Sequence, residues 1–434
     1  MKLFQQMLVA SAAVGLIAPL GAQATDINLE EMNSYRSSSS KKQKFNSQTF
    51  ANEIATLEES VDNLEDKFND FEAGSFSDTT TMDTKVVFTA GGTDHSLVQT
   101  DGTDSLTFNY TIQSNLNTSF TGDDNLYIRL KTGNHSGWSV SKAHGGYLSA
   151  GNSNGDALKV DKIWYQFPVG DRNTVWIGPK IENYYMHGTS PSIYKPVTKQ
   201  FTLGGNGEAY GASTDTGAGW AWKGDNGFAI STNVGTKSHT SCKGTVSGCG
   251  STGSYVESGL LTGETKTSWA TQVGITKSQW SASVLVNQKF NDWSDTYYHS
   301  AGHSPSSSDE NFTSVGLRTW WRPLDSGSAI PSVSLGYDTT TYGGAPAASD
   351  SSTAWFAGLT WEDSFNANDR IGIAFGQPTT NEDETTDPFA YEAYYQFQIN
   401  DSVTMTPTVF GGQDRNGTAG SDIFGALVNT TFKF

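Results

Sequence analysis

Basic and aromatic side chains alternate with apolar ones in several short segments, and they are the residues best suited to binding chemistry. Leu126, Ile128 and Leu130 would share one face of an extended segment, which leaves its basic residues on the other face. A guanidinium donates hydrogen bonds in a fixed fork and an aromatic ring can stack on a sugar, whereas a ring of basic groups would favour anions. The alternative is that these charges are only hydrated, or paired with carboxylates, and select nothing. The residues assigned to this second face are Arg129, Lys131, Lys162, Trp164, Arg318, Trp320, Arg322 and Glu392.

The histidines and cysteines do not indicate a catalytic or metal centre. His299 and His303 are four residues apart, but they lie in a long polar stretch without helical context. No Gly-x-Ser-x-Gly nucleophile elbow carries a Ser/His/Asp site. Cys242 and Cys249 lie in a Gly/Ser/Thr-rich stretch and are predicted to form a structural disulfide; a redox or metal pair would need further partners nearby. We therefore expect no enzyme activity, no metal and no cofactor.

Short extended segments with this alternation recur from Lys85 to the end of the chain, and they must position the residues above. One face suited to lipid and one suited to water is typical of a strand in a transmembrane barrel. The last segment is also too short and too polar to be a spanning helix. In that segment, one face carries Phe424, Ala426, Val428, Thr430, Phe432 and Phe434, and the other carries Gly425, Leu427, Asn429, Thr431 and Lys433.

Short and long connections alternate between these segments. Turn chemistry such as Gly224-Asp225-Asn226-Gly227 marks the short ones. They join residues 112 to 126, 167 to 175, 222 to 228, 275 to 280, 321 to 330, 361 to 371, and 399 to 403. Long polar stretches cover roughly 91–105, 132–159, 179–212, 235–267, 288–311, 338–353, 377–390 and 411–422.

Seven short and eight long connections predict an all-β membrane protein, a 16-stranded antiparallel transmembrane β-barrel over residues 82–434. A barrel of this size leaves an aqueous channel rather than a packed core. Several outward aromatics are predicted beside the short connections, as in a membrane girdle. These are Trp222, Phe228, Trp280, Trp321 and Trp361.

The first 74 residues have a different pattern. Residues 1–24 are predicted to be a secretory signal peptide, because the apolar run is shorter than the alternative, a membrane anchor, requires. Residues 25–46 suggest a linker. In residues 47–74 a heptad seam predicts a short coiled-coil helix, and we expect a homotrimer through residues 50–71. The seam alone also allows a dimer, or a helix packed on its own domain. It consists of Phe50, Ile54, Leu57, Val61, Leu64, Phe68 and Phe71.

The composition agrees with an exported strand-rich chain. The formal net charge of -18 argues against nucleic acid as a partner. Charged residues make up only 17%, compared with about a quarter in soluble proteins. Many short strands joined by polar loops account for this composition.

Three segments resemble a known family. Met1-Lys2-Leu3-Phe4-Gln5-Gln6, the stretch from Leu57 to Glu65 and the stretch from Phe76 to Thr81 are similar to cyanobacterial outer-membrane porins, which belong with the carbohydrate-selective, OprB-like porins. The resemblance implies an outer-membrane protein that passes small hydrophilic solutes: sugars in the namesake branch, inorganic ions including iron in the cyanobacterial branch. Relatives usually carry an S-layer homology domain, and only Thr25 to Thr49 occupy that place here. Anchoring through that domain is therefore not expected.

The resemblance also implies a role for the third long loop, which narrows the pore in many porins. Its charged residues are constriction candidates, namely Lys180, Glu182, Lys195, Lys199 and Glu208. The expected function is passive diffusion through a water-filled barrel, with outer-membrane lipid and small solutes or ions as partners. The alternative is a trimeric structural or adhesive envelope protein without significant channel activity.

Overall fold

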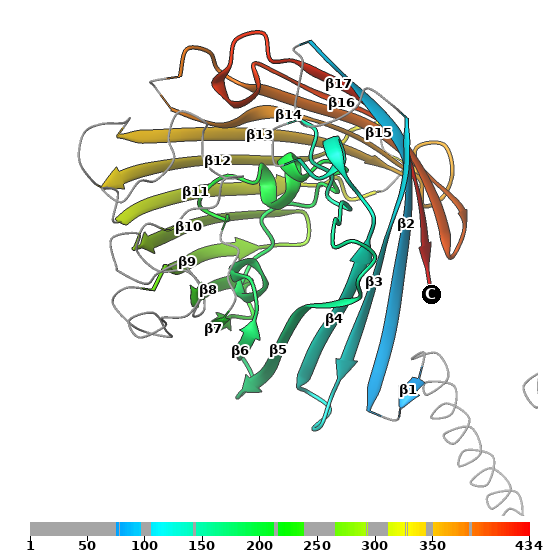
Figure 1. The fold of residues 1–434 in the computed structure, drawn as a ribbon. Coiled ribbons are helices and arrows are strands. Elements are labelled where there is room, and N and C mark those ends of the chain that lie inside the picture. Colours follow the sequence, from blue (N-terminus) through cyan, green and yellow to red (C-terminus); the bar gives the residue numbers. More distant parts are fainter. Residues whose placement is uncertain are drawn as a thin grey trace, which may run out of the picture. The chain divides into compact units, whose positions relative to one another are not determined.

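Strands form where apolar and polar side chains alternate, and together they close into a barrel in the computed structural model (Figure 1). The structure describes residues 75–77, 79–96, 106–141, 145–211, 216–237, 265–291, 293, 311–325, 327, 329–343, 350–381 and 384–434. The predicted signal peptide, linker, coiled-coil helix and Cys242–Cys249 pair lie outside these residues.

The strands follow one another around the barrel in chain order. Their bounds are β1 (Ser75–Ser77), β2 (Thr80–His95), β3 (Thr107–Thr118), β4 (Asn125–Gly133), β5 (Lys159–Val169), β6 (Asn173–Lys180), β7 (Thr216–Lys223), β8 (Phe228–Thr236), β9 (Thr267–Thr276), β10 (Trp280–Phe290), β11 (Asn311–Trp321), β12 (Ser332–Gly343), β13 (Ser351–Glu362), β14 (Arg370–Asn381), β15 (Phe389–Asn400), β16 (Val403–Gln413) and β17 (Ile423–Lys433). Four short 3-10 helices lie in the loops: η2 (Gly137–Ser139), η3 (Asn183–Met186), η4 (Lys199–Gly204) and η5 (Arg415–Gly417).

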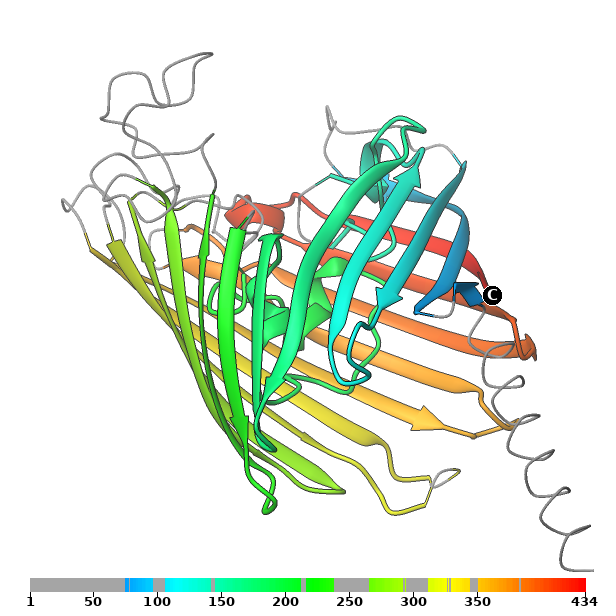
Figure 2. The same cartoon turned by 90° about the horizontal axis from the view of Figure 1, so that it is seen from below.

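Pairing of the last strand with the first long one closes the sheet. Each strand from β2 to β16 pairs antiparallel with its successor, and β17 pairs with β2 from Ile423 opposite His95 to Lys433 opposite Lys85. β1 pairs antiparallel with the first two residues of β2, Thr80 and Thr81. The prediction of a 16-stranded antiparallel barrel is therefore confirmed. Figure 2 shows the same wall turned by 90°.

The seven short connections are those expected from the sequence, and they all lie at one end of the barrel, here called the short-turn end. The strand ends that flank the long connections lie at the other end, here called the long-loop end. Three predicted loops were too long, because β2 continues to His95, β12 to Gly343 and β14 to Asn381. Polar residues can continue a strand when they face the interior, as Asp338 and Thr340 do in β12.

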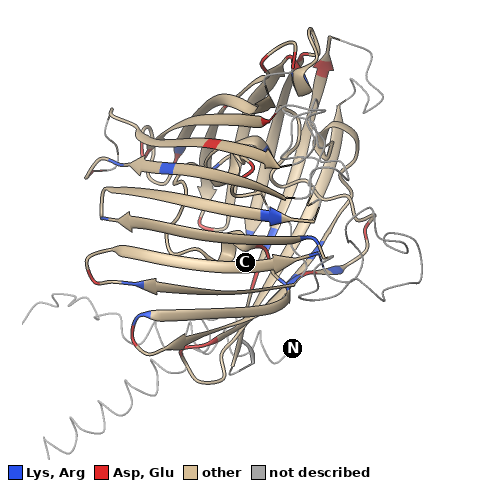
Figure 3. Cartoon of the chain, turned by 90° about the vertical axis from the view of Figure 1, so that its left-hand side faces the viewer, with Lys and Arg blue, Asp and Glu red and all other residues tan. Residues whose placement is uncertain are grey.

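The outward face carries the apolar and aromatic residues. Trp280 and Trp321 are exposed at the short-turn end. At the seam between β17 and β2, the Phe88 ring contacts Phe108 and Phe432, with centroids 5.9 and 5.2 Å apart. Along the strands drawn in Figure 3, most of the length is uncharged. Among the described residues, no helix is long and apolar enough to cross a membrane.

The interior differs from the expected open channel, because part of it is a packed apolar cluster. Loop residues meet inward-facing barrel residues there: Trp138 stacks near Phe410, and Phe201 lies against Phe356. The cause is local, since two long loops fold inward and bring apolar side chains with them. The remaining space lies to one side of this cluster.

Candidate functional site

The third long loop lies inside the barrel (Figure 1). This loop, L3, comprises residues 181–215 between β6 and β7, of which 181–211 are described. The Gly188 amide donates to Ser231 Oγ, the Thr189 amide to Gln272 Oε1, and Trp320 Nε1 to the Ser190 carbonyl at 3.3 Å. L3 therefore crosses the interior along the wall of β8–β11.

One buried carboxylate fastens the middle of L3 to β15. Glu392 Oε1 accepts hydrogen bonds from Tyr194 Oη at 2.9 Å and from the Val197 amide at 3.1 Å. Its Oε2 accepts from the Thr198 amide and hydroxyl at 2.7 and 2.6 Å. Burial, and then the Glu392 carboxylate, raise the pKa of Tyr194 well above its ordinary value, so this phenol remains a donor. Glu392 thus holds L3 rather than meeting solvent.

A buried ion pair fastens the end of L3 to β11 and β12. Arg318 Nη2 lies 2.6 Å from Asp338 Oδ2, and Arg318 Nε donates to the Leu203 carbonyl at 2.8 Å. The guanidinium also lies over the ring of Tyr210, 4.5 Å from its centroid. Gly336 allows this close approach, because a Cβ there would overlap the Gly204 carbonyl oxygen.

A third fastening holds the residues after η4. Tyr342 Oη donates to Glu208 Oε2 at 2.8 Å, and Lys289 Nζ donates to the Glu208 carbonyl at 2.7 Å. Glu208 is 1% exposed. It therefore binds the wall instead of facing a solute.

The start of L3 packs on an aromatic and basic cluster of β4 and β5. Trp164 stacks on Tyr127 at 4.0 Å between centroids and contacts Tyr185 of η3 at 4.5 Å. The Arg129 guanidinium lies 5.6 Å from the Tyr127 ring centroid and pairs with Asp161 at 3.3 Å. Beside this cluster, Lys162 pairs with Glu182 at 3.0 Å.

The second long loop, L2, also folds inward. It comprises residues 134–158 between β4 and β5, and Leu148 forms an isolated antiparallel bridge with Thr198 of L3. The Ser149 amide donates to the Val197 carbonyl at 2.8 Å, and the Lys199 amide to the Tyr147 carbonyl at 2.7 Å. L2 and L3 therefore form one inserted unit.

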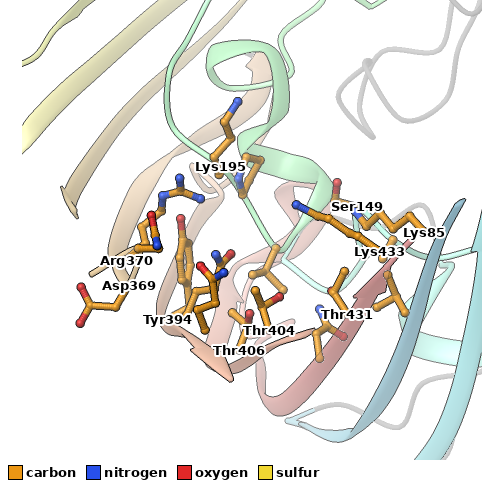
Figure 4. A pocket seen from close by; sticks show the side chains of 18 of the residues that line it. Lys85, Ser149, Lys195, Asp369, Arg370, Tyr394, Thr404, Thr406, Thr431 and Lys433 are labelled. Atoms are coloured by element: carbon orange, nitrogen blue, oxygen red, sulfur yellow. The ribbon is translucent and has the colours of Figure 1, made fainter. Parts of the chain in front are cut away.

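A polar cavity of about 840 Å³ remains beside this unit (Figure 4). Lys85 and Lys433 lie on one side of it, Asp369 and Arg370 on the opposite side, and Lys195 reaches it from L3. Lys131 also lines it. Threonines and glutamines make up much of the remaining wall, including Thr404, Thr406, Thr431, Gln396 and Gln398.

The predicted site residues therefore separate into different environments. Arg318, Trp320, Lys162, Trp164, Glu392, Glu182 and Glu208 contact L3 or the wall beneath it, and Lys131 and Lys195 line the cavity. Arg322 is exposed at the short-turn end, where Nε donates to the Ser278 carbonyl. Lys180 Nζ donates to the Val160 carbonyl, and Lys199 belongs to η4.

Most of the cavity residues were not among the predicted site residues, and Lys85 and Lys433 are two of them. Lys433 had been placed on the correct face of its strand, but nothing in the sequence indicated its neighbours. Lys85 lies opposite it only because β17 pairs with β2. The signal that would have identified both is the register across the closing seam.

Comparisons with known proteins agree on a porin. Residues 38–413 match the sequence model of the family described as carbohydrate-selective porin, OprB family. An uncharacterized protein of Nostoc sp. strain PCC 7120, alr4550, is 26% identical and matches 89% of this chain and 70% of its own length. Two solved structures share the fold. A high-pH structure of Pseudomonas putida OprB has a TM-score of 0.55 at 12% identity, covering 82% of this chain and 94% of that one. The trimer form of Vibrio cholerae OmpT has a TM-score of 0.51 at 7% identity, covering 82% and 100%.

Proposed function

We propose that small hydrophilic solutes diffuse passively through this protein. The chain belongs to the OprB family of carbohydrate-selective porins and is an outer-membrane channel. Sugars, inorganic ions or both would pass down their own concentration gradients, with no cofactor and no energy input. The inserted unit of L2 and L3 would set the size limit, because it occupies much of the bore.

The observation that carries this proposal is the polar cavity beside L3 inside a closed barrel. A cavity of about 840 Å³ is large enough for a small hydrated solute. Its hydroxyl, amide and charged side chains can replace water around a polar solute. The packed apolar cluster, which shares Tyr194, Val197 and Tyr394 with the cavity wall, would bound the passage on that side.

The orientation follows from the two ends of the barrel. In outer-membrane barrels the short turns face the periplasm and the long loops face outward. The outward apolar residues would then contact lipid, and the aromatics near the short turns would lie at its periplasmic interface. Solutes would enter from the long-loop end.

The hydroxyl and amide side chains of the cavity favour sugars as one solute class. Threonine hydroxyls and glutamine amides can exchange hydrogen bonds with sugar hydroxyls. The rings of Tyr127, Trp164 and Tyr185 pack on one another and on Arg129, so they support L3 instead. Liposome swelling in isosmotic arabinose, glucose and sucrose would rank entry by size. Exclusion of all three sugars would restrict the proposal to ions.

Single-channel recording in planar bilayers tests the proposal most directly. Purified protein should insert with discrete conductance steps in potassium chloride. Heat-denatured protein from the same preparation should give none, which controls for detergent leaks. A correctly folded barrel without steps would contradict the proposal and favour the structural or adhesive alternative.

We also propose that the channel is a homotrimer joined through residues 50–71. The support is the heptad seam in the sequence, together with the trimer form of the similar OmpT barrel. Native mass spectrometry of the full chain should give three copies. Removal of residues 47–74 should weaken that assembly while leaving single-barrel conductance intact, and an unchanged trimer would contradict a role for the seam.

A further inference from the structure

Four lysines stand in one row across five neighbouring strands. Cross-strand pairing places Lys433 of β17 opposite Lys85 of β2, and Lys85 opposite Gln113 of β3. Gln113 lies opposite Lys131 of β4, and Lys131 opposite Lys159 of β5. Directly paired residues of adjacent strands point to the same side of a sheet. These residues, here called the lysine row, therefore share the interior face of the wall.

The lysine row climbs along the barrel axis from the short-turn end toward the long-loop end. Lys433 is the last residue of β17, at the short-turn end, and Lys159 is the first residue of β5, at the long-loop end. Adjacent strands are about 4.8 Å apart, so four steps span about 19 Å along the wall. Because barrel strands tilt by roughly 40°, this path rises about 12 Å along the barrel axis.

Among the described residues, the row's lysines have no acidic partner, unlike several basic residues of the same interior. Arg129, Lys162 and Arg318 each pair with a carboxylate. In the part of the chain that the structure describes, none of the row's four lysines lies within 4.0 Å of a carboxylate oxygen. Their ammonium groups are left for solvent or a passing ion.

The row borders the open part of the interior. Lys85, Gln113, Lys131 and Lys433 all line the cavity of about 840 Å³, and Lys195 of L3 lies across from them (Figure 4). An ion in this cavity would therefore meet ammonium groups from both the wall and the loop.

The acids near the row are mostly engaged. Asp161 pairs with Arg129, and Asp83 accepts from Asn115 Nδ2 at 2.7 Å. Of the acids that line the cavity, Glu362 pairs with Arg370 at 3.1 Å. The other three belong to short turns, namely Asp363, Asp369 and Asp401. They lie at one end of the path, whereas the lysines extend along it.

We propose that the lysine row is a binding path for small inorganic anions and makes this channel prefer anions over cations. The inference rests on the proposed channel function and adds the solute class. Adjacent strands lie about 4.8 Å apart, so an anion would move from one ammonium group to the next along the row, passing Gln113 between Lys85 and Lys131. A cation would be repelled along the same wall. Unpaired charges in a narrow, partly dehydrated bore act strongly on ions.

Reversal potentials under a potassium chloride gradient test the inference. The unmodified protein should pass chloride in preference to potassium. The double variant Lys85→Gln/Lys131→Gln should lower the chloride-to-potassium permeability ratio roughly two-fold at 0.1 M salt, where the screening length is about 10 Å. The difference should shrink at 1 M salt, where that length is about 3 Å. Lys433 is left intact because it belongs to the strand that closes the barrel.

Two controls make the result specific. Lys223→Gln/Lys277→Gln removes the same charge at the short-turn end outside the row and should leave the ratio unchanged. Lys85→Arg/Lys131→Arg keeps the charge and should keep the preference. Normal conductance steps with equal ratios in the glutamine variant and the unmodified protein would overturn the inference while leaving the channel function standing. Absence of steps in the unmodified protein would overturn both.

Discussion

The two sides of the barrel interior use charged side chains in opposite ways. On the wall of β9–β15, Arg318, Asp338 and Glu392 are buried and bonded to L3 or to one another. On the wall of β17 and β2–β4, Lys433, Lys85 and Lys131 of the lysine row line the cavity, and none of them pairs with a carboxylate among the described residues. Buried charges require partners, whereas solvated ones do not. The comparison teaches that position relative to L3, and not residue type, decides whether an interior charge holds structure or meets a solute.

The largest effect should come from breaking the buried ion pair. Arg318→Ala leaves Asp338 buried without its cation, which typically costs about 3–5 kcal/mol. We expect L3 to detach from the wall, with larger and noisier single-channel conductance and rapid tryptic cleavage after Lys199, whereas trypsin does not cut the Lys195–Pro196 bond. Arg322→Ala, at the exposed end of the same strand, is the matched control. Equal conductance and equal protease resistance in the two variants would show that L3 does not depend on this pair.

Removing the charge of Glu392 should have a smaller effect on the same loop. Glu392→Gln keeps the side-chain shape, but an amide cannot accept all four hydrogen bonds from L3. A loss of about 2 kcal/mol is expected, given the usual strength of hydrogen bonds to a charged group. Protease sensitivity of L3 should rise less than in Arg318→Ala. Glu362→Gln, which removes an exposed carboxylate of the neighbouring wall, should leave L3 resistant.

Acid should loosen L3 through His187. Burial lowers the pKa of His187 to about 3, and neither ring nitrogen has a hydrogen-bond partner among the described residues. A released loop would bind a proton near the ordinary pKa of about 6.5. The contribution of His187 to loop seating is therefore complete above about pH 6.5 and is lost as the pH falls toward 3.

Open-channel noise measured at pH 7.5 and pH 5 should rise at the lower value. His187→Phe fills the same apolar site without a titrating group and should remove most of that change. If the variant keeps the full pH dependence, another group controls the loop.

The smallest expected change in ion selectivity comes from comparing an unpaired lysine of the cavity wall with a neighbouring salt bridge. Arg129→Gln combined with Asp161→Asn removes one cation and one anion, so the summed charge of the bore stays constant. Lys131→Gln removes a cation alone. We expect a modest fall in the chloride-to-potassium permeability ratio only for Lys131→Gln, measured from reversal potentials. A larger fall in the double variant would place the selective charge in the aromatic cluster instead.

Much of the barrel could be predicted because strand facing is a local property. Alternation alone assigned Phe424 to Phe434 to two faces, and turn residues marked the seven short connections. Loop ends were less certain, since an inward strand segment such as Asp338–Tyr342 is as polar as a loop. The alternation shows which face of a strand a residue occupies, but it does not show what surrounds the side chain there.

The candidate site could be predicted only in part, because it depends on contacts between distant segments. Arg318 and Lys131 have the same sequence pattern, yet L3 covers the first and leaves the second open. Glu392 lies nearly 200 residues from Thr198, and no local pattern indicates their hydrogen bonds. Lys85 and Lys433 meet only through the register of the closing seam.

That seam has a consequence for assembly. Lys433 and Lys85 come from opposite ends of the barrel sequence, so they become neighbours only when the final strand docks against the earliest one. A sheet that has not yet sealed would have two unpaired edges and an interrupted set of ammonium groups. Ion selectivity would then arise only in the last step of barrel assembly, and a folding intermediate with an open sheet would not discriminate between anions and cations.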